Sequence, residues 1–142
     1  MSFWATSALV PTIAVEPTTS HMRELLGDDA SVTVWWGAMV ELAAAIARQE
    51  RSATLGQDLA RDAYAALDGV SARWAEIPPT EPLRDDARRL VRVYDLRAAD
   101  AFQLAAARVA ADGQPASLPF VTLDERLALA ASREGFPVLG LD

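Results

Sequence analysis

The sequence predicts an α/β fold with a mostly parallel central sheet flanked by helices. Two observations support this prediction. Short apolar runs typical of strands alternate with longer segments typical of helices, and no two strand-like runs are joined as a long hairpin. Because crossovers between parallel strands are right-handed, the carboxyl ends of the strands should meet at one edge of the sheet. Ligands bind at that edge in such folds, so we expect a functional site there.

The first half of the chain contributes two predicted strands. Residues 3–5 form a short apolar run, and a helix that begins at Thr6 is expected to be cut short by Pro11. Thr19 and Ser20 are typical of a helix start, and residues 31–36 are rich in β-branched and aromatic side chains, which favour a strand. Two further helices are then expected over residues 37–51 and 55–70.

The second half continues the same alternation. A short strand over residues 73–77 is stopped by two prolines, and a polar loop with Gly and Pro occupies residues 112–117. The remaining predicted elements are helices over 82–94, 98–110 and 125–134, and strands over 118–123 and 136–139.

Composition limits the class of protein. A chain of 142 residues with 51% hydrophobic residues is the size of a single domain with one core. We expect no membrane segment and no signal peptide, and the absence of cysteine excludes thiolate metal sites and fits the cytoplasm. The net charge is −7 and no lysine is present, so RNA or DNA would bind only through a local arginine patch or bound cations.

Three carboxylates lie in contexts that suggest a site. Glu41 shares a helical stripe with alanines, Asp100 lies in an apolar helix start, and Asp124 follows a strand. Each also has a structural explanation. Glu41 could be a surface residue, Asp100 could be favoured in the first turn of its helix by the helix dipole, and Asp124 could be an N-cap. A parallel sheet would bring all three to one edge. Oxygen ligands without His or Cys point to Mg²⁺ or Mn²⁺.

Four stretches of the chain resemble a known family. They are "FWATSALVP", "WWGAMVELAAAIAR", "LRAADAFQLAAA" and "FVTLDERLALAASREGFPVL". In this order and spacing they resemble PIN-domain ribonucleases, specifically the VapC-type toxins of bacterial toxin–antitoxin pairs. The resemblance covers nearly the whole chain. It implies a PIN-like fold in a single domain over residues 1–142.

The resemblance also implies which residues are functional. Glu41, Asp100 and Asp124 match three members of the family's acidic quartet, which holds metal and carries catalysis. The fourth member, the Asp that ends the first strand, falls on Ala5. We interpret Ala5 as a deliberate Asp→Ala change that protects an expression host, with a naturally degenerate homologue as the alternative.

Other residues receive secondary roles. Thr6 and Ser7 match hydroxyl residues that shape the family's metal site, and Arg97 is our candidate for guiding an RNA phosphate. The arginines in residues 84–92 are expected to form a salt-bridged surface, because Asp85 and Asp86 lie beside them. Three tryptophans next to strands are expected to be core residues rather than a platform for bases: Trp4, Trp35 and Trp36.

The function implied by the resemblance is metal-dependent hydrolysis of RNA phosphodiester bonds with Mg²⁺ or Mn²⁺. Glu41, Asp100 and Asp124 would be catalytic, and Ala5 should leave this form inactive or weakened. The implied partners are a cognate VapB-like antitoxin, an RNA substrate and a second copy of the chain, with no membrane.

Three other classes of protein share features with this sequence. A catalytically silent PIN-like module that binds an antitoxin or RNA is the main alternative. A response regulator would need a lysine near the C-terminus, and this chain has none. A haloacid-dehalogenase-type phosphatase would need an Asp nucleophile on the first strand, where this chain has Ala5, and a second Asp two residues later.

Overall fold

A computed structural model describes residues 1–14, 19–29, 31–52 and 54–141 of the chain. In these residues five strands form one sheet in the order β3-β2-β1-β4-β5, and all four neighbouring pairs are parallel. The predicted mostly parallel sheet is therefore confirmed. The strands are β1 (Ser2–Trp4), β2 (Val32–Trp35), β3 (Ala75–Ile77), β4 (Phe120–Val121) and β5 (Val138–Leu139).

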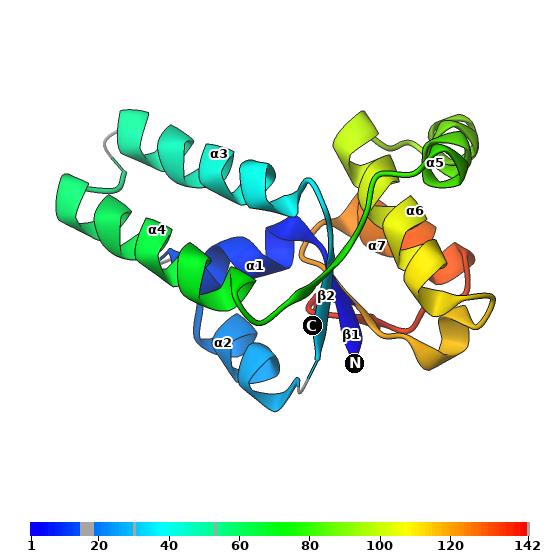
Figure 1. Cartoon of the computed structure of the whole chain (residues 1–142), viewed down its shortest axis with the longest axis horizontal. Helices are drawn as coiled ribbons and strands as arrows, with labels where there is room; N and C mark the ends of the chain where they lie inside the picture. Colours follow the sequence, from blue (N-terminus) through cyan, green and yellow to red (C-terminus); the bar gives the residue numbers. More distant parts are fainter. Residues whose placement is uncertain (15–18, 30, 53, 142) are drawn as a thin grey trace.

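Helices cover both faces of the sheet. Figure 1 shows the first four helices on one side and the last three on the other. The helices are α1 (Thr6–Ile13), α2 (Thr19–Asp28), α3 (Ala38–Arg51), α4 (Gln57–Ser71), α5 (Glu81–Val93), α6 (Ala98–Ala111) and α7 (Glu125–Arg133), with a 3₁₀ turn at Pro115–Ser117. None of the helices in the described part of the chain has the length and apolar character required to span a bilayer.

The sheet separates two hydrophobic cores. Successive strand residues point to opposite faces, so Phe3 packs with α5, α6 and α7 while Trp4 packs with the first four helices. Phe120 and Val121 divide between the two cores in the same way. Burial on both faces is typical of parallel strands and explains why the strands read as continuous apolar runs.

The strand bounds differ from those that the sequence suggested: β1 is shifted by one residue, and the other four strands of the described residues are shorter. The run over residues 3–5 becomes Ser2–Trp4, because Ala5 already has the role of N-cap of α1. The run over 118–123 pairs only at Phe120–Val121, although Leu118 and Thr122 are also buried. Burial extends beyond the hydrogen-bonded ladder, so an apolar run overestimates the length of a strand.

Two local predictions were wrong. Pro11 does not end α1, which continues to Ile13; its fixed φ is compatible with a helix, and only one backbone donor is lost. Trp4 and Trp35 are buried as expected, but Trp36 is 55% exposed. Trp36 follows the end of β2 and lies in the turn before α3, so the sheet does not direct its side chain into either core.

The topology gathers the predicted site residues at the carboxyl edge of the sheet. β1 leads through Ala5 into α1, β2 leads into α3 with Glu41 in its first turn, and β4 leads to Asp124 at the start of α7. The first turn of α6 adds Asp100.

Candidate active site

Glu41 is held in place by two side chains from other helices. The Thr6 hydroxyl donates to Glu41 Oε1 at 3.0 Å, and Gln103 Nε2 donates to the same oxygen at 3.0 Å and to Oε2 at 3.3 Å. Gln103 also accepts a hydrogen bond from the Thr6 backbone N–H at 3.2 Å. Thr6, the predicted site-shaping residue, therefore joins α1 to the carboxylate of α3. The half-buried Glu41 is not an ordinary surface residue.

Gln103 was missed by the sequence analysis. It is only 5% exposed and connects Glu41 with Thr6. A signal was available, because Gln103 is a lone amide within the apolar stretch Ala101–Ala107 of α6. A buried amide must find hydrogen-bond partners, so such a residue indicates a polar neighbour from another element.

Ser7 organises the junction that leads to Asp124. Its hydroxyl lies 3.1 Å from that of Thr122 and accepts from the Leu123 backbone N–H at 3.0 Å. Thr122 in turn accepts from the Asp124 backbone N–H at 3.0 Å. Ser7 thus fixes the end of β4 against the start of α1. Thr122, which is fully buried, is a second residue that the sequence analysis did not single out.

Asp124 is an N-cap, as its structural explanation proposed. One carboxylate oxygen, Oδ1, accepts from the Leu127 backbone N–H at 2.9 Å. A cap uses a single oxygen of the carboxylate, so capping and ligand binding are compatible roles for this residue.

Asp100 is the electrostatic centre of the three acids. Burial raises its pKa, and the charge of Asp124 raises it further, while a backbone hydrogen bond and the charge of Arg97 oppose the change. Burial also raises the pKa of Glu41; hydrogen bonds from Thr6 and Gln103 lower it, and the charge of Asp100 raises it. The two outer acids therefore both interact with Asp100.

The hollows around the acids also place Asp100 between Glu41 and Asp124. One is lined by Asp100, Asp124 and Arg97, and a second is lined by Asp100, Glu41 and Gln103. Within the described residues, no group of three or more His, Cys, Asp or Glu side chains is placed to hold a metal ion. The acids thus form two neighbouring pairs that share Asp100, and their roles as ligands stay a prediction.

Ala5 lies at the N-cap position of α1 without the side chain that such a position uses. Its backbone is extended (φ −75°, ψ 154°), its N–H donates to the Val121 carbonyl at 2.9 Å, and no side-chain cap is present. Alanine is a poor N-cap, whereas aspartate and asparagine are among the best. The backbone here has the geometry of an Asp or Asn N-cap, but the residue is a fully buried alanine.

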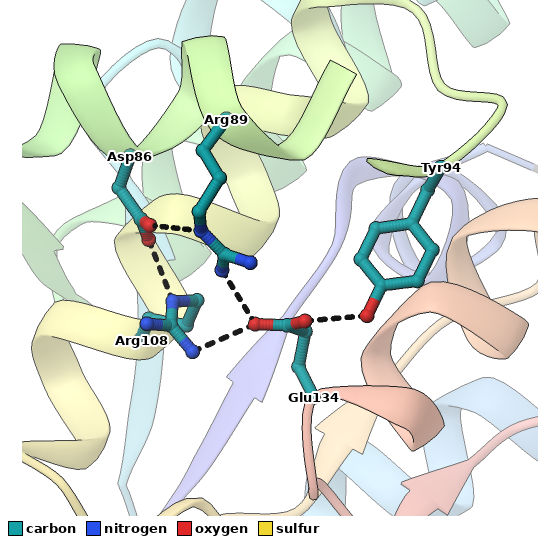
Figure 2. Close-up of polar contacts among 5 residues, drawn as sticks. All are labelled: Asp86, Arg89, Tyr94, Arg108 and Glu134. Atoms are coloured by element: carbon teal, nitrogen blue, oxygen red, sulfur yellow. Dashed lines mark hydrogen bonds and ion pairs between the residues drawn. The ribbon is translucent and has the colours of Figure 1, made fainter. Parts of the chain in front are cut away.

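The arginines divide into two groups. Arg97 is exposed at the N-cap of α6 and lines the hollow between Asp100 and Asp124, which is compatible with its predicted role. Arg89 belongs to a salt-bridged cluster with Asp86, Arg108, Glu134 and Tyr94, shown in Figure 2. The expected salt-bridged surface therefore exists for Arg89, and Glu134 is a partner that the local sequence did not indicate.

The shifted pKa of Asp100 predicts a pH-dependent stability. Because its pKa is raised above 3.8 in the folded chain, folding favours the protonated form, and stability falls as pH rises from 3.8 through the folded-state pKa. We expect Asp100→Asn to stabilise the metal-free protein by about 0.5–2 kcal/mol at pH 7, and to have little effect at pH 3. Thermal unfolding in EDTA measures this, with the exposed Asp95→Asn as the control. Equal or lower stability of Asp100→Asn at pH 7 would contradict it.

No protein-family model and no curated protein sequence matches the chain. Solved structures do match it. FitAcB from Neisseria gonorrhoeae has a TM-score of 0.68 and 16% identity, covering 99% of this chain and 97% of its own. VapC20 from Mycobacterium tuberculosis, a sarcin–ricin loop cleaving toxin, has a TM-score of 0.68 and 18% identity, covering 96% of each chain. PAE2754 from Pyrobaculum aerophilum has a TM-score of 0.67 and 18% identity, covering 96% and 87%. The chain therefore has the PIN-like α/β fold that its sequence predicted.

Proposed function

We propose that this chain is a toxin-type endoribonuclease that hydrolyses RNA phosphodiester bonds with Mg²⁺ or Mn²⁺, and that Ala5 impairs it in this form. The observation that carries the proposal is the placement of Asp100 between two other carboxylates at the carboxyl edge of a parallel sheet. Similarity in fold to VapC20, a toxin that cleaves the sarcin–ricin loop, supports RNA as the substrate class.

The three acids have the oxygen ligands that a divalent cation prefers, but one carboxylate fewer than the proposed ligand set requires. All three are carboxylates that repel one another through Asp100, as hard-cation ligands do before the ion binds. A bound cation would lower the pKa of a water molecule and offset charge on the reacting phosphate. Asp100 and Asp124 would hold it, and Glu41 would act as a further ligand or orient the attacking water. A fourth carboxylate at position 5 is the group that this ligand set lacks.

The remaining residues would position the substrate and the acids. Thr6 and Gln103 fix the rotamer of Glu41, and Ser7 fixes the loop that carries Asp124. Arg97 would contact a phosphate next to the site, because a guanidinium binds phosphate oxygens in pairs. Cleavage of single-stranded RNA by the Ala5→Asp variant with Mg²⁺, lost in EDTA, tests the proposal.

A second candidate function is a catalytically silent module that binds an antitoxin or RNA. The buried Ala5 favours it, as does the lack of a three-carboxylate group among the described residues. The two functions differ in one respect: a silent module should gain no cleavage activity when a carboxylate is restored at position 5.

We also propose a VapB-like antitoxin as the partner, a homodimer as the assembly and the cytoplasm as the location. Co-expression with the small neighbouring gene should give a complex that survives size-exclusion chromatography, and Ala5 should not prevent it. Ala5 is fully buried, so it contributes no exposed surface to a partner. Absence of any co-purifying small protein would favour an enzyme that acts alone.

A further inference from the structure

We propose that Trp36, together with Arg84, forms a stacking site for an unpaired RNA base beside the acidic site. This inference rests on the proposed RNA substrate and names the part of the chain that would hold a nucleotide next to the one being cleaved. The acids would act at a phosphate, and among the described residues no aromatic side chain lines the two hollows around them.

Trp36 is a large apolar side chain that is exposed to solvent. It is 55% exposed and forms a T-shaped pair with Trp35, with ring centres 6.2 Å apart and an interplanar angle of 74°. Trp35 is buried and stacks on Phe102 at 5.1 Å with an interplanar angle of 1°. A fixed aromatic pair thus supports the exposed ring. Such a ring presents a face for stacking at little cost in side-chain freedom.

Gly37 shows that the support is tightly built. A Cβ at this position would collide with the ring nitrogen of Trp35. A side chain at position 37 would therefore push the Trp35 ring out of its present place.

The surroundings of Trp36 suit a nucleotide. Trp36 and Arg84 line the same hollow, together with Thr80 and Glu81 at the start of α5. Arg84 is exposed, and among the described residues no salt bridge engages it. An aromatic face next to an unpaired guanidinium offers stacking to a base and charge to its phosphate. The negative charge of Glu81 repels phosphates, so the RNA backbone should follow the side of the hollow that Arg84 lines.

The hollow shares its elements with the acids. Trp36 lies two residues before the start of α3, whose first turn carries Glu41, and Phe102 is followed on α6 by Gln103, whose side chain holds Glu41. A strand of RNA with its phosphate at the acids would therefore place a neighbouring base within reach of Trp36.

The charge of the chain makes stacking, rather than general electrostatic attraction, the expected source of affinity for RNA at this hollow. With a net charge of −7, general attraction to phosphates is absent, so affinity for RNA must come largely from contacts that do not depend on charge. Stacking on an exposed tryptophan is such a contact. Binding of a protein partner or of a second copy of the chain at this hollow would contradict the proposal.

The test measures binding without cleavage. Anisotropy of fluorescein-labelled hexaadenylate RNA in EDTA gives Kd for the unchanged chain and for Trp36→Ala, Trp36→Phe and Arg84→Gln. Trp74→Phe is the matched control, because Trp74 is partly exposed just before β3, at the opposite edge of the sheet. An abasic oligonucleotide of the same length separates base stacking from backbone attraction.

We expect Trp36→Ala to weaken hexaadenylate binding roughly 10-fold with an unchanged salt dependence, and Trp36→Phe to weaken it less. A plot of log K against log salt concentration has a negative slope, and Arg84→Gln should make that slope less steep by about 0.7. Trp74→Phe should bind hexaadenylate with the Kd of the unchanged chain. The abasic oligonucleotide should bind Trp36→Ala and the unchanged chain with equal Kd.

Equal hexaadenylate affinity of the unchanged chain and Trp36→Ala would overturn the proposal. So would a Trp36→Ala effect seen only on the oligomeric state or on a complex with a small partner protein, which would make this surface a protein interface. The ribonuclease proposal is tested separately. If Ala5→Asp fails to cleave while Trp36→Ala still loses affinity, the stacking site stands and the nuclease proposal falls.

Discussion

Replacing Ala5 by aspartate is expected to raise metal-dependent RNA cleavage by at least about 100-fold, because ligands of one site act as a unit. The added carboxylate would follow β1 directly, at the edge where Glu41, Asp100 and Asp124 already lie. It would join two pairs of acids into one set able to compete with the hydration shell of Mg²⁺. Cleavage of a labelled single-stranded RNA, with and without EDTA, measures the rate.

Ala5→Asn is the matched control for this experiment. Position 5 is the uncapped N-cap of α1, so Asp and Asn, which are nearly equal in size, should make the same cap and bear the same cost of entering a buried position. Only Asp adds charge, and in metal-free buffer its repulsion by the other acids should make it less stable than Asn. Only Asp should also make the chain toxic to a host that lacks the antitoxin.

The Asp100→Asn change in the Ala5→Asp background should return cleavage to the level of the unchanged chain, because Asp100 is the acid that interacts with both others. Cleavage by Ala5→Asp at the level of Ala5→Asn would contradict the nuclease proposal and favour the silent binding module.

The sequence predicted the fold well because its signals are local. Strand-like runs such as 31–36 and the helix start at Thr19 need no knowledge of the rest of the chain, and the four family-like stretches added the order of the elements. Strand ends were less accurate because pairing depends on the neighbouring strand. Phe120–Val121 pairs with only two residues of β1, although the apolar run is longer.

The site could be predicted only where a residue type carries the signal. Acids next to strand ends are visible in the sequence. The contact between Glu41 and Gln103, however, joins residues 62 positions apart, and it forms because α3 and α6 meet at the carboxyl edge of the sheet from opposite faces. Trp36 shows the opposite error. Its type suggested a core residue, and only the turn after β2 explains its exposure.

Glu134 is the second residue whose replacement should have a large effect, here on stability. It accepts from Arg89 at 2.6 Å and from Arg108 at 2.7 Å through one oxygen, and from the Tyr94 hydroxyl through the other. Figure 2 shows this carboxylate between the three donors. Burial acts to raise the pKa of Glu134, but these hydrogen bonds and the two positive charges outweigh it and lower the pKa. One residue at the end of α7 thus joins α5 and α6.

Glu134→Ala should destabilise the chain by about 2 kcal/mol and lower Tm by roughly 6–8 °C. The cost is below that of a fully buried ion pair, because the Arg89 and Arg108 side chains are 42% and 37% exposed. Because the folded-state pKa is lowered, this contribution is present above pH 4.5 and is lost as pH falls through the folded-state value, so the two proteins should converge in acid. Asp58→Ala, which breaks the exposed pair with Arg61, should change Tm by no more than about 2 °C. Equal effects of the two substitutions on Tm would mean that Glu134 does not hold the three helices together.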